Sequence, residues 1–285
     1  MPKLSFIKGI FSFIQRYFKT VVFLTIVLFI LTSNQEKSDW ETPNLMQIEI
    51  KGAILDSSAY IELFEKASKD NIKGVLVNID SPGGAVPPSI EIAYMIKELK
   101  KLKPVIVYAS GTMASGSYYA SIFADKIIAN PGSMVGSIGV LFYSANLKEL
   151  LTKIGIKPNI LKAGKYKLVG NPTREPLPHE TQMLQTLIGD IYHLFVTDVA
   201  QARKLDVAEH KTFADGKVFL AHKAKEVGLI DEVATILRAK EVLIQASNVV
   251  KPIWYKKDKL DIMLERFSAK LEAVMVSTLT KTYFY

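Results

Sequence analysis

The chain has 285 residues, of which 49% are apolar, with no cysteine and a formal net charge of +8 at pH 7. This length can bury one large core, so we expect one main domain with appendages. The absence of cysteine excludes a disulfide framework and a cysteine nucleophile. The lysines are dispersed and no nucleic-acid motif accompanies them. We therefore attribute the positive charge to solvated faces or to attraction to anionic lipid, and expect no nucleic-acid partner.

The N-terminal region predicts a membrane anchor. Residues 1–16 mix apolar side chains with three basic ones, and an uncharged apolar run covers 21–31. Counted over 17–33, the candidate span has 17 residues, which is the short limit for a transmembrane helix. The alternative is the apolar part of a signal peptide, but no Ala-x-Ala-like cleavage site follows the run. Because basic residues precede the span and acidic ones follow it, we expect the N-terminus in the cytoplasm and the main domain outside.

After the anchor (1–33), the sequence predicts a polar linker (34–44), a main domain (45–250) and an amphipathic basic C-terminal helix (251–285). The main domain alternates strand and helix patterns, which indicates a layered α/β core. Expected strands are 45–54, 74–79, 104–108, 126–129, 136–142, 158–162 and 228–232; expected helices are 57–67, 87–99, a short one starting at Ser115, 147–154, 178–205 and 220–227. For the C-terminal helix three placements stay open: between subunits, on a membrane surface, or docked on the domain.

A serine follows one of these strands at the start of a helix. Ser115 comes after the apolar strand 104–108, within a stretch of small residues. The next residue, Gly116, leaves its backbone N–H open to a substrate oxygen, and the helix N-terminus adds partial positive charge there. A second such amide is expected from Gly83 or Gly84, in the turn after strand 74–79, and we favour Gly84. The alternative interpretation is that Ser115 only caps a buried helix.

Four stretches together resemble one peptidase family. They are Tyr-Ala-Ser-Gly-Thr-Met-Ala-Ser-Gly-Ser-Tyr-Tyr-Ala at 108–120, Ser-Pro-Gly-Gly at 81–84, Gly-Ser-Ile-Gly-Val at 136–140 and Lys-Ala-Gly-Lys-Tyr-Lys at 162–167. In this order they resemble the signal peptide peptidase A family, also called protease IV, over about 47–233. Its members are membrane-bound serine peptidases with a Ser-Lys dyad. The resemblance implies a Clp-protease/crotonase-like core of repeated strand-strand-helix units, preceded here by one transmembrane helix.

The resemblance also assigns roles. It implies Ser115 as nucleophile, Lys167 as general base, Ser137 as the residue that orients the lysine, and Gly84 with Gly116 as the oxyanion hole. Expected substrates are cleaved signal peptides and other unfolded apolar segments. Expected partners are the inner (plasma) membrane and further copies of the chain in a homo-oligomer. The sequence shows no metal-ligand cluster and no nucleotide loop, so we expect no metal and no cofactor.

The residues themselves also favour a lysine base. None of the four histidines sits in a glycine-flanked turn like that of Ser115, which disfavours a Ser-His-Asp triad. A lysine acts as a base near pH 7 only if its pKa falls from about 10.4 by about 2 to 3 units, and burial away from carboxylates achieves this. Lys167 has apolar neighbours, and no acidic residue lies between Glu149 and Glu175. Lys165 is the rival, because residues two apart in a strand face the same side.

Two departures from the family pattern and two rival functions qualify this interpretation. Pro87-Pro88 replaces a small or polar pair, and Leu168-Val-Gly170 follows the candidate base where an acidic residue is more usual. The rival functions are a crotonase-like acyl-CoA enzyme and a non-catalytic membrane scaffold. Neither of these needs the hydroxyl of Ser115, so the dyad decides between them and a peptidase.

Overall fold

The computed structural model describes residues 16–33 and 42–256, and the chain divides into two units between Thr42 and Pro43. In the first unit, α2 (Phe18–Ser33) is a 16-residue apolar helix, on which side chains such as Phe23 and Leu24 are exposed. Across the two described ranges, no helix has the length and apolarity needed to cross a membrane. The C-terminal helix predicted over 251–285 is wrong for residues 251–256, which are not helical because Trp254 forms a bridge with Leu45; the rest of that prediction, from 257 onward, lies outside the described residues.

Within residues 43–256, seven strands form one sheet, and the mixed α/β class predicted from the sequence is confirmed. The strands are β1 (Leu45–Lys51), β2 (Gly74–Ser81), β3 (Val105–Ala114), β4 (Lys126–Ala129), β5 (Met134–Gly136), β6 (Val218–Leu220) and β7 (Glu232–Val233). The main path runs β1-β2-β3-β4-β7, while β5 pairs with β3 and with β6. Every pairing is parallel except that of β5 with β6.

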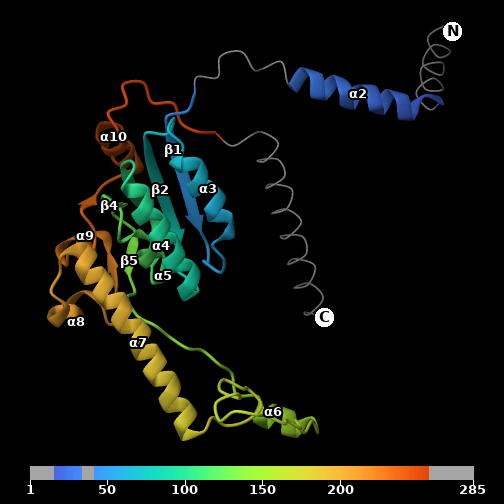
Figure 1. The fold of residues 1–285 in the computed structure, drawn as a ribbon, viewed down its shortest axis with the longest axis vertical. Coiled ribbons are helices and arrows are strands. Elements are labelled where there is room, and N and C mark those ends of the chain that lie inside the picture. The colour runs from blue at the N-terminus through green and yellow to red at the C-terminus, as the bar shows by residue number, and fades with distance from the viewer. Residues whose placement is uncertain (1–15, 34–41, 257–285) are drawn as a thin grey trace. The chain divides into compact units, whose positions relative to one another are not determined.

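Helices cover both faces of this sheet (Figure 1). The helices of residues 43–256 are α3 (Ser58–Ser68), α4 (Val86–Lys100), α5 (Gly116–Ser121), α6 (Lys148–Lys153), α7 (Pro178–Arg203), α8 (His210–Phe213), α9 (Ala221–Glu226) and α10 (Ile236–Ala246), with a 3₁₀ turn at Val207–Glu209. Successive side chains of a strand point to opposite faces. Val75 and Val77 therefore enter the larger core beneath α3, α4 and α5, whereas Leu76 enters a smaller core beneath α10.

Several boundaries differ from the prediction. β3 continues to Ala114, with a register shift against β2, so Ser115 directly follows a ten-residue strand. Residues 158–162 form no strand and are exposed, because no neighbouring strand is there to pair with them. Residues 137–142 are irregular, since the strand ends at Gly136. The sequence analysis assigned no element at α10.

Residues 141–190 form an arm that extends away from the sheet (Figure 1). It comprises the largely exposed segment 141–177, which includes α6, and the first half of the 26-residue α7. An ion pair between Arg174 and the buried Glu180 stabilises the turn before α7. Glu180 is 1% exposed and accepts hydrogen bonds from the Arg174 guanidinium at 2.6 and 2.8 Å. Glu180 also accepts a bond from the Leu177 N–H at 2.9 Å, which caps α7.

We expect acid to loosen the arm through Glu180. The hydrogen bonds from Arg174 and from the Leu177 N–H lower the pKa of Glu180 to about 2. A carboxyl whose pKa is lowered by folding stabilises the native state above its unfolded pKa, and this stability is lost as the pH falls toward the folded value. The unfolding temperature of Glu180→Gln should therefore lie below that of wild type at pH 7, and the difference should shrink between about pH 4.5 and 2.5.

Calorimetry across this pH range measures the effect. Glu226→Gln is the control, because its ion pair with Lys223 is exposed on both sides and contributes little. A Glu180→Gln difference that stays constant with pH would contradict this account.

Candidate active site

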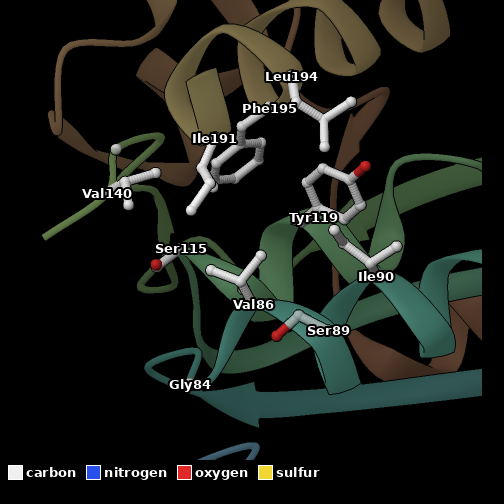
Figure 2. A pocket seen from close by; sticks show the side chains of 12 residues that line it. Gly84, Val86, Ser89, Ile90, Ser115, Tyr119, Val140, Ile191, Leu194 and Phe195 are labelled. Atoms are coloured by element: carbon white, nitrogen blue, oxygen red, sulfur yellow. The ribbon is translucent and has the colours of Figure 1, made fainter. Parts of the chain in front are cut away.

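Ser115 sits in a strained turn between β3 and α5. Its φ of 53° and ψ of −124° lie in a region that non-glycine residues rarely adopt. The turn is fixed at both ends: the Ser115 N–H donates to the Gly136 carbonyl at 2.8 Å, and its carbonyl accepts from the Tyr119 N–H at 3.0 Å. The Ser115 hydroxyl makes no cap bond to α5, so the capping interpretation fails. Figure 2 shows this hydroxyl at the edge of a pocket.

Two glycines of the turn after β2 lie against this serine. A Cβ on Gly83, whose φ is 98°, would lie 2.6 Å from the Gly116 nitrogen and 2.9 Å from the Ser115 Cβ. Only glycine fits such a close approach. A Cβ on Gly116 would lie 3.2 Å from the Gly84 nitrogen, so the backbones of residues 84 and 116 are neighbours. The structure thus brings Ser115, Gly84 and Gly116 together.

The backbone N–H groups of Gly84 and Gly116 are not used by the hydrogen bonds around them. Gly84 and Ile54 form an isolated β-bridge. Its two hydrogen bonds run from the Ile54 N–H to the Gly83 carbonyl and from the Ala85 N–H to the Ile54 carbonyl, so the bridge does not use the Gly84 N–H. Gly116 is the first residue of α5, where an N–H has no intrahelical acceptor. These N–H groups can donate to one substrate oxygen beside Ser115.

Gly84→Ala should destabilise the fold and disrupt the site together. The added Cβ would lie 2.0 Å from the Ile54 carbonyl oxygen, so the turn must shift. We expect a loss of about 2 kcal/mol or more in unfolding free energy, measured by urea denaturation. Gly189→Ala is the matched control, because nothing lies within 4 Å of its Cβ and alanine favours the helix. Equal stabilities for the two variants would contradict the close packing.

Ser137 lies next to Ser115 across paired strands. The register of β3 and β5 aligns Ala114 with Gly136, so the two serines occupy equivalent positions just beyond them. Ser137 also has a positive φ, of 50°, and its N–H donates to the Lys217 carbonyl at 2.6 Å. This neighbour relationship places a second hydroxyl at the same edge of the sheet.

The pocket beside Ser115 has a largely apolar wall built by three elements and one loop. It is lined by Gly84, Val86, Ser89, Ile90, Ser115, Gly116, Tyr119, Gly139, Val140, Ile191, Leu194 and Phe195 (Figure 2). Tyr119 meets Phe195 edge to face, with ring centroids 5.0 Å apart, and its hydroxyl donates to Asp198. Burial, together with this hydrogen bond to Asp198, raises the pKa of Tyr119, so the phenol remains a neutral donor. The site can therefore hold an apolar side chain next to the serine.

Sequence reasoning missed this wall. The apolar stripe of α7 supplies Ile191, Leu194 and Phe195 to the pocket. No spacing rule distinguishes a stripe that lines a pocket from one that packs in a core. Pro87-Pro88 lies in the first turn of α4, where the missing N–H of proline costs nothing.

Lys167 does not reach this pocket within its own chain. It is exposed, and it lies in a series of turns in the arm. Its neighbour Tyr166 packs edge to face on His179, with ring centroids 5.4 Å apart. His179 precedes Ile191 by twelve residues in α7, which corresponds to about 18 Å along the helix. Lys165 is equally exposed, with its Nζ 5.3 Å from the Tyr166 ring centroid.

The histidines also lie outside this pocket within their own chain. None of the four lines the pocket with Ser115. His193 and His222 are exposed, and His210 interacts with the Val207 carbonyl at 3.0 Å. The part of the chain that the structure describes contains no cluster of three or more His, Cys, Asp or Glu that could hold a metal ion.

Comparison with known families matches residues 97–250 to the family described as Peptidase family S49. The chain belongs to this family. The match covers more than half of the chain and includes Ser115, Ser137 and Lys167. The resemblance drawn from the four sequence stretches is thereby confirmed.

Relatives within the family carry protease names. A protein of Methanocaldococcus jannaschii, named provisionally as a protease, is 43% identical over 198 residues, which cover 69% of this chain and 64% of that protein. A protein of Enterococcus faecium, named provisionally as signal peptide peptidase SppA, is 35% identical over 176 residues, covering 61% of this chain and 51% of the relative. The matched region therefore spans less than two thirds of either relative's length.

A solved structure shares the fold. A mutant of the 1510-N membrane-bound stomatin-specific protease superposes with a TM-score of 0.52 at 16% identity, covering 76% of this chain and all of that chain. At this identity the similarity establishes the architecture alone.

Proposed function

We propose that the protein is a serine endopeptidase whose nucleophile is Ser115. One observation carries the proposal: a serine in a strained strand-to-helix turn lies beside the backbone of two glycines and an apolar pocket. In the reaction, Ser115 Oγ attacks the scissile carbonyl carbon and gives its proton to the base. The N–H groups of Gly84 and Gly116 stabilise the oxyanion, and collapse expels the amine, which takes that proton. Water activated by the same base then hydrolyses the acyl-enzyme.

Lys167 is our proposed base, supplied to Ser115 by the arm of a second copy. In its own chain this lysine is exposed and far along the arm from the pocket. The desolvation that a lysine base needs must then come from surface outside its own chain. The arm also exposes Leu141, Tyr143 and Leu161, at 82%, 85% and 95%, as expected of a contact surface. This supports a homo-oligomer in which Ser137 orients the incoming lysine.

The proposed setting is a membrane surface. The side chains of α2 are apolar and exposed on the described part of that helix, which supports an anchor that includes α2. With the N-terminus in the cytoplasm, the peptidase domain would lie outside the inner membrane. Cleaved signal peptides and other unfolded apolar segments suit the apolar pocket and this location.

Hydrolysis of a fluorogenic apolar peptide by the full chain in detergent tests the proposal. Wild type should cleave it and Ser115→Ala should not. If the folded, assembled wild type cleaves no peptide, the result favours the non-catalytic membrane scaffold instead. Cleavage by Ser115→Ala at the wild-type rate would remove the serine from the chemistry.

A further inference from the structure

A surface groove between α3 and α4 combines an apolar floor with an acidic rim. Phe64 and Leu99 form part of its floor and are 5% and 4% exposed. Ile61 and Leu102 line it with 42% and 67% of their surface exposed, and Met95 lies half-buried between the helices. Exposed leucine and isoleucine over a continuous apolar floor indicate a surface that another segment covers.

The rim of this groove carries three carboxylates, from Glu65, Glu91 and Glu98. Among residues 16–33 and 42–256, Glu65 and Glu91 form no ion pair. Glu98 pairs at 2.6 Å with Lys101, an exposed contact that costs little to exchange. Glu91 and Glu98 are seven residues apart in α4, so they lie on one line about 10.5 Å apart along the helix.

The described chain ends beside one end of this groove. The Tyr255 N–H donates to the Leu45 carbonyl at 2.7 Å, and Asn44 binds the backbone of Ile253 through its side chain at 2.8 Å. The loop after α3 contacts the same strand, because the Lys73 N–H donates to the Asn44 carbonyl at 2.7 Å. Lys103 Nζ binds three carbonyls at the end of α3, which fixes the end of α4 there.

The basic edge of the sequence that follows is complementary to the two carboxylates on the α4 side of the groove. At helical spacing, residues after 256 place an apolar stripe between a basic and an acidic edge. The stripe comprises Leu260, Met263, Leu264, Phe267, Leu271 and Val274; the basic edge comprises Lys259, Arg266 and Lys270; the acidic edge comprises Asp261, Glu265 and Glu272. Lys259 and Arg266 are seven residues apart, the same spacing as Glu91 and Glu98.

We infer that the groove between α3 and α4 is the docking site for residues 259–274 of the same chain. The segment starts where α4 ends, so it runs antiparallel to α4 along the groove. Crossovers between parallel strands are right-handed as a rule, and with this hand a helix placed there with its stripe inward carries its basic edge over α4. Lys259 then meets Glu98 and Arg266 meets Glu91, while Met263 lies near Met95.

Cross-linking of the full chain tests this docking, and the absence of native cysteine makes the test clean. Met95→Cys combined with Met263→Cys, treated with a short bis-maleimide in detergent, should cross-link within one chain. Met95→Cys combined with Ile262→Cys is the control, because residue 262 points away from the groove. The first pair should react at least about tenfold faster, since docking holds its thiols at a high effective concentration.

Charge reversal is the second test of the docking. Glu91→Lys with Glu98→Lys should slow the cross-link, and adding Lys259→Glu with Arg266→Glu should restore it. If Met95→Cys fails to fold, Ile61→Cys with Phe267→Cys takes its place, because Ile61 is already exposed. Equal rates for residues 262 and 263 would overturn the docking. Cross-links formed only between chains would overturn it in favour of a second copy as the occupant.

Discussion

Replacing Ser115 by alanine should reduce kcat for hydrolysis of an apolar peptide by about 10⁴- to 10⁶-fold, because the attacking oxygen is lost. The change removes one oxygen from a half-buried side chain whose hydroxyl does not cap α5. The turn is held by backbone bonds to Gly136 and Tyr119, and these remain. Steady-state kinetics with the full chain in detergent measures the effect, and substrate binding should persist.

Ser110→Ala is the control for this variant. Ser110 lies in the same strand but outside the pocket, and its hydroxyl makes only a long bond of 3.3 Å to the Ile79 carbonyl. Both variants should unfold within a few degrees of wild type, and only Ser115→Ala should be inactive. Inactivity of Ser110→Ala with an unchanged melting curve would show that the assay reports something other than the hydroxyl of Ser115.

The local parts of the site follow from the sequence. A serine after an apolar strand and before small residues predicted the junction of β3 and α5, and the glycine pair after β2 predicted a close-approach turn. These features depend on a few neighbouring residues, and glycine is needed in these turns because the backbones approach each other closely. The strained φ of Ser115 is not readable from its sequence, because it is set by bonds to distant residues such as Gly136.

The long-range contacts of the site cannot be predicted from the sequence. Nothing in the stripe of α7 indicates that Phe195 meets Tyr119 or that Asp198 binds its hydroxyl. The distance between Lys167 and Ser115 depends on the direction of the arm, whose second part is the first half of α7 extending away from the sheet. Apolar residues around Lys167 suggested burial, whereas the single chain leaves it exposed. A side chain that is buried only in an assembly carries the same sequence signal as one buried in the monomer.

Mixing two inactive variants should therefore restore activity. Ser115→Ala retains Lys167, and Lys167→Ala retains Ser115, so a mixed assembly contains sites with both groups if each site draws them from different copies. Random assembly from equal amounts gives both groups to about one quarter of the sites, which sets the expected recovery relative to wild type. Coexpression of the two variants followed by the peptide assay measures it.

The controls separate this arrangement from a site within one chain. Ser115→Ala mixed with the double variant Ser115→Ala/Lys167→Ala should recover nothing, because no copy carries the nucleophile. Lys165→Ala alone should keep most activity if Lys167 is the base, although both lysines are exposed in the arm. If Ser115→Ala and Lys167→Ala form mixed assemblies without recovery, the arm must instead fold back onto its own pocket. Since α7 carries both the pocket wall and the start of the arm, that movement would have to bend or break the helix between His179 and Ile191.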